Sequence, residues 1–357
     1  MPETKNIIVD LEKIANPYSG LGQFSLELAK SLLYNCPEDF QVYFLIPDKI
    51  DKNVIPTDTQ QRILSLKEWK NASTYFKNSI HLWHTTHQFP KYLPDKTIPV
   101  VTTIHDLNFL YEKPRWKHPK YLYKINKIIK RSSHIIAISD FTKNDIMQHF
   151  HDNGLPEISV IHNSYEIPII TEQKPVNDCI NKPFLFSIGI FHPKKNFHLL
   201  VEMMRDIEHY QLVLAGDHQT SYGKFVKKLI RKYQIEDKIV LCGKITENEK
   251  WWYLKNCMAL LFPSKAEGFG LPVLEGFAAG CPVILSNQGA LKETGGDAAF
   301  YWSNLDPDTM AKELKHYIEK FNTEKDTYQK SMKQRLNVFN RSTAALQHFS
   351  LYRKLIE

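Results

Sequence analysis

The chain has 357 residues and a formal net charge of +7, and 43% of its residues are hydrophobic while 24% are charged. This length suits two domains, each large enough to bury its own core, and the composition is that of a globular protein. Because no uninterrupted apolar run approaches the ~20 residues of a membrane-spanning helix, we expect no transmembrane segment.

Strand-like and helical segments alternate along the chain, which favours an α/β fold with parallel, doubly wound sheets. In the first series, a helix is expected from about Gln23 to Tyr34, and strands are expected at residues 7–10, 42–46, 80–83, 100–104, 135–138 and 158–161. Pro168 to Pro183 loses periodicity and is interpreted as a linker. Six further strands complete a second Rossmann-like unit, at residues 184–188, 212–215, 239–241, 258–262, 283–285 and 299–301. We therefore predict an N-terminal Rossmann-like domain, a C-terminal Rossmann-like domain and a final helix, over residues 1–170, 183–340 and 341–357.

A basic segment, residues 113–131, carries eight Lys or Arg residues and no Asp or Glu. Within it Leu122, Ile125, Ile128 and Ile129 recur at helical spacing, so one face of the expected helix is apolar and the rest is cationic. Two interpretations remain open. Either the apolar face packs on its own domain, or the segment contacts anionic lipid, where each basic residue can contribute about 1 kcal/mol. No nucleic-acid-binding module accompanies it, so we expect no nucleic acid partner.

The N-terminus and the cysteines indicate the compartment. Ile7-Ile8-Val9 is too short for the apolar region of a signal peptide and runs directly into Asp10. The five cysteines are scattered and form no C-x-x-C pair, which is typical of reduced thiols. We therefore expect a cytoplasmic protein, with the inner face of the plasma membrane as its working site if residues 113–131 bind lipid.

The most informative string is Glu267-Gly268-Phe269-Gly270-Leu271-Pro272-Val273-Leu274-Glu275. It follows an expected strand and leads into a helix expected to open at the proline, where a missing N–H costs nothing. Its two glycines let the backbone approach a ligand, and amides at a helix N-terminus attract phosphate. Glu267 in the loop and Glu275 in the first turn flank this seat, and carboxylates accept hydrogen bonds from sugar hydroxyls. Alternatively, each glutamate is only a solvated charge or a complement to the helix dipole.

Three other loops follow expected strands, at the edge where doubly wound folds bind ligands. The loop from Gly189 contains Lys194 and Lys195, which can reach a diphosphate, although surface lysines commonly have no such role. Ser19-Gly20-Leu21-Gly22 can approach a phosphate, yet most such turns only reverse the chain. His105 and Asp106 follow the strand at 100–104, where a lone histidine is more often structural than functional.

Two strings imitate metal sites. His81, His84 and His87 begin on an expected strand, whose period of two does not align residues three apart; we therefore favour a cleft or acceptor loop over zinc. Asp306-Pro307-Asp308 imitates a D-x-D metal motif, but Asp306 is better explained as a helix cap with proline at the first helical position. We predict no metal site and no metal requirement.

Several of these strings resemble a known family. The two glutamates match the E-x7-E motif of the retaining family 4 glycosyltransferases, and the family's A-x-G-x-P-V-I and G-D-A-A strings are similar to residues 278–284 and 296–299. Residues 189–196 resemble the G-x-x-x-P-R-K-N loop of its bacterial mannosyltransferase-like branch, with Lys194 where the family has arginine. The resemblance implies the GT-B architecture, in which two Rossmann-like domains face across a cleft and a C-terminal helix crosses back to the first domain. It also implies that residues 1–170 bind the acceptor and residues 183–340 bind the nucleotide sugar. This chain has Asn340-Arg341 where the family has an aromatic residue before that helix.

The resemblance also implies roles for individual residues. Catalytic roles fall to His105, Glu267 and Lys195, with the first two holding the transferred sugar and the lysine meeting the diphosphate. Asp106 and His87 fall on the acceptor side. Donor binding falls to Gly20, Gly22, Gly189, Lys194, Lys195, Phe269, Gly270, Leu271 and Glu275, with Glu275 on the ribose.

We therefore expect a retaining, metal-independent hexosyltransferase that uses a nucleotide diphosphate sugar, with GDP-mannose preferred on branch resemblance. Its acceptor would be a hydroxyl of a glycan or lipid-linked molecule in surface polysaccharide biosynthesis, and no cofactor is expected. The alternatives are a UDP-sugar donor, a nucleotide-sugar epimerase or sugar phosphorylase on the same fold, and an inactive relative that only binds.

Overall fold

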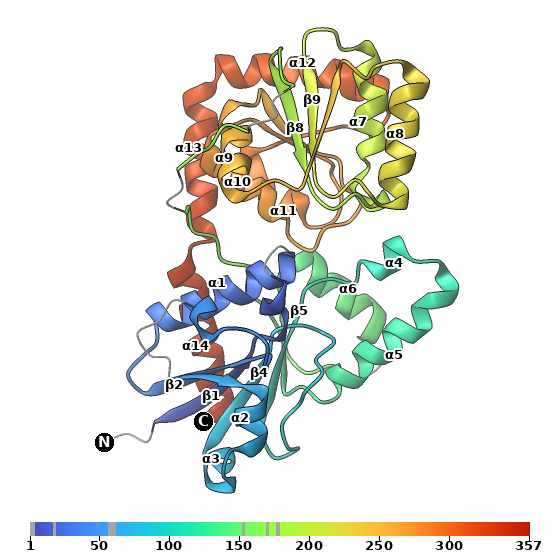
Figure 1. The fold of residues 1–357 in the computed structure, drawn as a ribbon. Helices are drawn as coiled ribbons and strands as arrows, with labels where there is room; N and C mark the ends of the chain where they lie inside the picture. Colours follow the sequence, from blue (N-terminus) through green and yellow to red (C-terminus); the bar gives the residue numbers. More distant parts are fainter. Residues whose placement is uncertain (1–3, 17–18, 56–61, 152–153, 169–170, 176–178) are drawn as a thin grey trace. The chain divides into compact units, whose positions relative to one another are not determined.

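The computed structural model describes residues 4–16, 19–55, 62–151, 154–168, 171–175 and 179–357. The chain divides into two compact units, each with its own parallel sheet flanked by helices (Figure 1). Unit 1 comprises Met1–Glu166 and Phe339–Glu357, and unit 2 comprises Ile167–Val338. Within the described ranges, no helix is both long and apolar enough to cross a membrane.

In the described part of unit 1, seven parallel strands form a sheet in the order β3-β2-β1-β4-β5-β6-β7. Six of them lie where strands are predicted, and β3 was not predicted. The order reverses between β1 and β4, and ligands of doubly wound sheets bind at such a reversal, outside the carboxyl ends of the strands. The strands are β1 Lys5–Asp10, β2 Phe40–Ile46, β3 Ile63–Ser65, β4 Ile80–Thr85, β5 Val100–Ile104, β6 His134–Ala137 and β7 Ile158–Val160.

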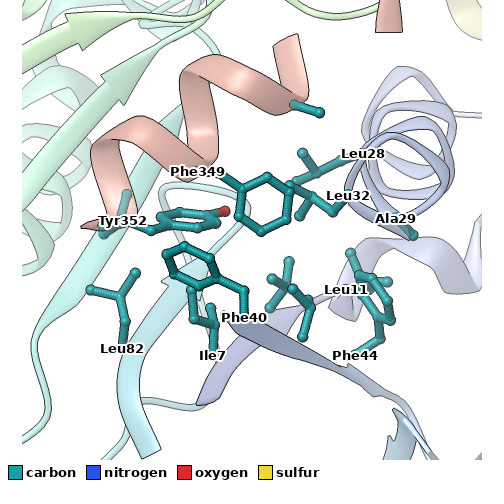
Figure 2. Close-up of a cluster of buried hydrophobic side chains, with 14 of the residues drawn as sticks. Ile7, Leu11, Leu28, Ala29, Leu32, Phe40, Phe44, Leu82, Phe349 and Tyr352 are labelled. Atoms are coloured by element: carbon teal, nitrogen blue, oxygen red, sulfur yellow. The ribbon is translucent and has the colours of Figure 1, made fainter. Parts of the chain in front are cut away.

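The core of unit 1 includes the last helix of the chain. Its helices are α1 Gly20–Tyr34, α2 Leu66–Asn71, α3 Thr74–Asn78, α4 Phe109–Glu112, α5 His118–Ile129, α6 Asp140–Phe150 and α14 Arg341–Ile356. From α14, the buried Phe349 and Tyr352 pack among side chains of α1, β1 and β2, and the Phe349 ring centroid lies 5.2 Å from that of Phe40 (Figure 2). Residues at opposite ends of the sequence therefore share one hydrophobic core.

The basic segment at 113–131 forms α5 and the turn before it. Ile125, Ile128 and Ile129 are buried, and Ile125 and Ile129 pack in a core cluster with residues of β5, β6 and α6. The apolar stripe that could have entered a bilayer is therefore used inside unit 1, as the first of the two interpretations has it. The large apolar side chains that remain exposed are Trp116 and Tyr123, at 76% and 73%.

In the described part of unit 2, six parallel strands form a sheet in the order β10-β9-β8-β11-β12-β13, which reverses between β8 and β11. All six were predicted, to within two residues at each end: β8 Phe184–Ile188, β9 Gln211–Ala215, β10 Ile239–Gly243, β11 Ala259–Phe262, β12 Val283–Leu285 and β13 Phe300–Tyr301. Its helices are α7 Phe197–Met203, α8 Ser221–Tyr233, α9 Glu247–Asn256, α10 Leu271–Ala279, α11 Leu291–Gly295, α12 Pro307–Thr323 and α13 Lys325–Val338. The Asp306 side chain accepts a hydrogen bond from the Thr309 amide at 3.0 Å, which confirms the predicted helix cap.

Candidate functional site

The loops that follow β8 and β11 meet at the strand-order reversal of unit 2. Lys195, from the loop after β8, places Nζ 2.7 Å from Oε1 of Glu267, from the loop after β11. The Asn196 side chain donates to the Pro263 carbonyl at 2.9 Å, which fastens the same two loops together. Two residues that were predicted separately, Lys195 and Glu267, are thus brought into one ion pair at the position where this fold class binds ligands.

The charges of this pair are held by their surroundings. Both side chains are largely buried, at 11% exposure for Lys195 and 13% for Glu267. Burial raises the pKa of Glu267, but the charges of Lys195 and Lys194 outweigh it and hold the pKa below its usual value. Lys195 Nζ also lies 4.4 Å from the ring centroid of Phe262, an attractive contact for a cation. Because an ammonium group has three N–H donors, Lys195 can bind an additional anion without leaving Glu267.

The start of α10 provides amides beside this pair. Gly270 adopts φ 102°, a conformation that side chains other than glycine rarely adopt, and a Cβ there would lie 2.9 Å from Leu291 Cδ2. The helix begins at Leu271. Pro272 has no N–H and the Val273 amide donates to the Gly270 carbonyl at 2.9 Å, which leaves the Leu271 amide as a first-turn donor without an intrahelical acceptor. The carbonyl of Phe269 accepts from Thr294 Oγ1 at 2.5 Å, which fixes the preceding loop.

The placement of Glu275 differs from the prediction. The helix begins at Leu271 and not at Pro272, because Gly270 is already the capping residue. Pro272 is the second helical residue, where an N–H would have no carbonyl of the helix to bond to, so its absence costs no hydrogen bond. Glu275 is consequently the fifth helical residue and lies beyond the first turn, so the prediction of a first-turn glutamate is wrong. Its side chain is buried, and Oε1 accepts from Lys250 Nζ of α9 at 2.6 Å.

Lys250 was not singled out from the sequence. It is buried, and its Nζ also lies 2.7 Å from Oε2 of the exposed Glu247. A signal was present: on α9, Lys250 shares a helix face with the buried Tyr253, Leu254 and Cys257. A lysine on an apolar face is buried, and a buried lysine requires an acidic partner.

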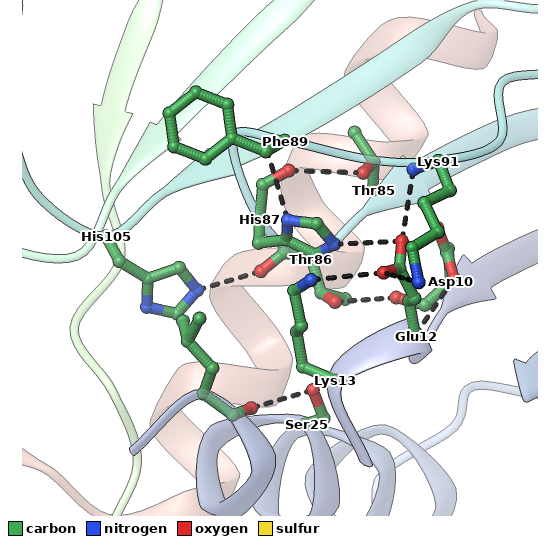
Figure 3. A network of polar contacts seen from close by, with 11 residues as sticks. Asp10, Glu12, Lys13, Ser25, Thr85, Thr86, His87, Phe89, Lys91 and His105 are labelled. Atoms are coloured by element: carbon green, nitrogen blue, oxygen red, sulfur yellow. Dashed lines mark hydrogen bonds and ion pairs between the residues drawn. The ribbon is translucent and has the colours of Figure 1, made fainter. Parts of the chain in front are cut away.

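Unit 1 has a comparable arrangement at its own strand-order reversal, between β1 and β4 (Figure 3). Glu12 lies in a short 3-10 helix, Glu12–Ala15, directly after β1. Its Oε1 lies 3.0 Å from Lys13 Nζ and 3.2 Å from Lys91 Nζ. Its Oε2 accepts from the Lys91 amide at 3.0 Å and lies 3.4 Å from Nε2 of His87, which follows β4. Burial raises the pKa of Glu12, but the contacts with His87 and Lys13 outweigh it, and the net pKa is low.

His87, predicted on the acceptor side, is buried in this cluster. Its Nδ1 accepts from the Phe89 amide at 3.1 Å, so the proton of a neutral ring sits on Nε2, which is buried and lies at ion-pair distance from Glu12 without forming a hydrogen bond among the described residues. The other two histidines of the same string have different partners. His81 Nδ1 accepts from the Asn6 amide at 3.0 Å, and His84 joins Tyr352 of α14 to Thr103 through bonds of 2.7 and 2.8 Å.

Asp10 at the end of β1 contacts the same cluster. Its Oδ1 accepts from the Glu12 amide at 3.0 Å, while Oδ2 is buried and has no hydrogen-bond partner among the described residues. Burial, with the nearby charge of Glu12, raises the pKa of Asp10 from 3.8 to about 7. Neither Asp10 nor Glu12 was predicted as a site residue, because a charged residue after a first strand has no distinctive sequence pattern.

His105 follows β5 and is also buried. Its Nε2 bonds to the Thr86 carbonyl at 2.8 Å and its ring packs edge-on against Phe24 of α1 at 4.5 Å. Since a carbonyl only accepts, Nε2 carries the proton and Nδ1 is an acceptor. Burial lowers the pKa of His105 to about 4, so the ring is neutral at neutral pH. The neighbouring Asp106 accepts from the amide and side chain of Asn108 at 3.0 and 2.9 Å, which shapes the loop.

The two glycines at the start of α1 have different surroundings. A Cβ on Gly22 would lie 1.9 Å from the Asn16 carbonyl oxygen, so only glycine fits there. A Cβ on Gly20 would have no atom of the described residues within 4 Å, which leaves the predicted approach of Gly20 to a phosphate sterically open. Part of the predicted loop, residues 17–18, lies outside the described residues.

Comparison with known families agrees with this arrangement. The family described as "Glycosyl transferases group 1" matches residues 170–335, within unit 2, and the "Glycosyltransferase Family 4" matches residues 49–167, almost all in unit 1. The chain is a family 4 glycosyltransferase. Both halves of this glycosyltransferase therefore carry a family match, and the predicted family and the pair of Rossmann-like units are confirmed.

Relatives of this glycosyltransferase include two mannosyltransferases. It is 26% identical to the O-antigen chain mannosyltransferase RfbU of Salmonella typhimurium over 61% of this chain and 59% of that protein. It is 25% identical to O-antigen chain mannosyltransferase B of Escherichia coli over 85% and 88% of the two chains. Similar folds include sucrose-phosphate synthase from Thermosynechococcus elongatus, with a TM-score of 0.73 and 19% identity over 98% and 99% of the chains. HepE from Anabaena, solved with UDP and glucose, has a TM-score of 0.70 and 14% identity over 98% and 100%.

Proposed function

We propose that this glycosyltransferase moves a hexose from a nucleotide diphosphate sugar to a hydroxyl of a glycan or lipid-linked acceptor, with retention of anomeric configuration. The observation that carries the proposal is the Lys195–Glu267 ion pair, whose glutamate lies in the loop that leads into α10. Lys195 and the Leu271 amide at the start of α10 suit the negative diphosphate, and an ionised Glu267 suits sugar hydroxyls. Mannose is the preferred sugar, since the two O-antigen relatives are named mannosyltransferases.

The proposed reaction exchanges one bond at the anomeric carbon for another. The bond from that carbon to the diphosphate oxygen breaks, and a bond to the acceptor oxygen forms on the same face. The acceptor proton passes to the leaving diphosphate oxygen, so no residue of the chain has to take it. Negative charge grows on the diphosphate in the transition state, where a pre-placed ammonium group and amides stabilise it. The low pKa of Glu267 keeps it ionised, which suits contact with a carbon that becomes positively charged and rules it out as an acid.

We propose that the reaction needs no divalent metal, because the charge that a metal would neutralise already has protein partners. Lys195 and the Leu271 amide at the start of α10 are its proposed partners, and Lys194 adds charge nearby. His105 is proposed to accept a hydrogen bond from a sugar hydroxyl at Nδ1, as a neutral ring can. We further propose that the exposed Trp116 and Tyr123, with the lysines around them, attach the protein to anionic membranes on the cytoplasmic side.

The function is tested by screening GDP-, UDP- and ADP-sugars for stabilisation. At 100 times its dissociation constant, a donor should stabilise the protein by about 2.7 kcal/mol, and GDP-mannose should give the largest rise in melting temperature. Mass spectrometry of glycan or lipid-linked acceptors should then show the added hexose. A larger rise with a UDP-sugar would assign that donor instead. No rise with any nucleotide sugar would contradict the proposed function, and phosphorolysis or epimerisation without an acceptor would reassign it.

A further inference from the structure

The buried ion pair between α9 and α10 concerns the glutamate that the E-x7-E string assigns to the donor ribose. Lys250 Nζ lies 2.6 Å from Glu275 Oε1 and 2.7 Å from Glu247 Oε2. The Lys250 and Glu275 side chains are 7% and 11% exposed, while Glu247 is 54% exposed. The ammonium group is therefore buried on the side of Glu275 and reaches solvent on the side of Glu247.

We propose that Lys250 is a positioning residue for the donor nucleotide: it holds one oxygen of Glu275 so that the other is presented to a ribose hydroxyl. The inference rests on the proposed function, since it supposes that Glu275 faces a nucleotide. It assigns a role to Lys250, which lies outside the E-x7-E string and arrives from a different helix.

The two oxygens of the Glu275 carboxylate have unequal surroundings. Oε1 accepts the bond from Lys250. Among the described residues none donates to Oε2, and Oε2 is not one of the buried polar atoms without a partner, so it stays open to solvent. A carboxylate fixed through one oxygen cannot rotate away, and its remaining oxygen can accept from a hydroxyl. Preorganisation of this kind reduces the entropy lost when the ligand binds.

The pair also gives Glu275 a cationic counter-ion. A carboxylate buried without a counter-ion takes up a proton in preference to remaining charged. Burial lowers the pKa of Lys250, but Glu275 and Glu247 outweigh it and the net pKa is raised. These two carboxylates are the charged groups that act on Lys250 within the described residues. A lysine that stays cationic remains the counter-ion of Glu275, and a charged donor makes the stronger hydrogen bond to it.

The test compares Lys250→Met with Glu247→Gln, which removes the other, exposed partner of the same ammonium. Titration calorimetry measures the dissociation constants of GDP, UDP and ADP and their sugars at pH 7.5 and pH 5.5. For the nucleotide that wild type binds, we expect Lys250→Met to weaken binding about ten-fold at pH 7.5, and further at pH 5.5 as the unpaired Glu275 takes up a proton. Glu247→Gln should bind within about two-fold of wild type.

Two more variants separate positioning from damage to the fold. Lys250→Arg keeps the charge and should restore most of the affinity. Glu275→Gln should weaken binding, and adding Lys250→Met to it should neither weaken binding further nor introduce pH dependence. If Lys250→Met does not fold, Lys250→Gln is measured against the same criteria.

The outcomes are distinguishable. Wild type that binds no nucleotide contradicts the proposed function itself. Wild type that binds a nucleotide, with Lys250→Met equal to it at both pH values, overturns the positioning role and leaves Lys250 a structural residue. A Lys250→Arg variant as weak as Lys250→Met would also overturn it, because the charge is retained.

Discussion

Asp10 gives the clearest quantitative prediction, because an ionisable group with an unpartnered oxygen is buried at the end of β1. Its pKa is raised from 3.8 to about 7 by burial and by the charge of Glu12. Between these values the folded protein retains a proton that the unfolded chain releases. The stabilisation that this proton contributes is therefore fully present below pH ~4, and it is lost as the pH rises towards 7. Each pKa unit corresponds to about 1.36 kcal/mol, so the loss across this window amounts to about 4 kcal/mol.

Asp10→Asn cannot ionise and should remove this dependence. Its amide can still accept the hydrogen bond from the Glu12 amide, although its NH2 group then occupies the place without a partner, at a cost of about 1–3 kcal/mol at every pH. The difference in stability between variant and wild type should thus shift in favour of the variant by about 4 kcal/mol from pH 4 to pH 8. For a unit of this size, that corresponds to roughly 8–16 °C in the difference of melting temperatures.

Scanning calorimetry of both proteins at pH 4, 5, 6, 7 and 8 measures this difference directly. Asp39→Asn is the matched control, because a bond from Arg353 lowers the pKa of this exposed aspartate. That variant should lose stability at neutral pH and match wild type in acid, the opposite sign to Asp10→Asn. A difference between Asp10→Asn and wild type that stays constant within about 2 °C over the whole range would refute the reasoning.

Four other outcomes are expected. Lys195→Ala should lower turnover roughly 10²–10³-fold, as loss of one preorganised stabiliser does; turnover equal to wild type would remove Lys195 from the site. Phe349→Ala should destabilise unit 1 by about 3–5 kcal/mol, seen as a lower urea midpoint, and a change below 1 kcal/mol would contradict its place in the core. Transfer should continue in EDTA, and activity restored only by Mg²⁺ or Mn²⁺ would overturn the metal-independent proposal. Sedimentation with anionic liposomes should disappear when four lysines of the basic segment become glutamate, while transfer to a soluble acceptor persists; wild type that does not sediment with such liposomes at low salt would show that the face is merely solvated. The lysines are Lys117, Lys120, Lys124 and Lys127.

The sequence predicts most of the fold, because buried parallel strands are apolar runs that alternate with amphipathic helices. The strand β3 was missed, since its three residues, Ile63–Ser65, give no period to detect. For the basic segment, spacing could show that Ile125 and Ile129 share a face but not whether lipid or the protein covers it. The structure shows that the protein covers this apolar face, while lipid contact through the exposed residues of the segment stays a prediction.

Sequence motifs identify several residues of the site, but they do not identify the charged side chains with which those residues pair. Glu267 and Lys195 lie 72 positions apart and carry recognisable strings, so each was predicted, yet only the structure joins them. Lys250 carries no such string, and its contact with Glu275 depends on how α9 packs against α10. Glu12 depends in the same way on the neighbouring ends of β1 and β4. Tertiary contacts of this kind are not encoded in local spacing.

The position of α14 has a consequence for how the protein is made. Unit 1 is interrupted in sequence by the whole of unit 2, and its core lacks Ala345, Phe349 and Tyr352 until α14 is translated. The nascent chain can thus complete unit 2 while unit 1 still exposes the apolar side chains that α14 will cover. Exposed apolar surface of this kind attracts chaperones and promotes aggregation. A premature stop before α14 would therefore leave the core of unit 1 incomplete, although most of unit 1 precedes unit 2 in the sequence. Unit 2 would keep its full sheet.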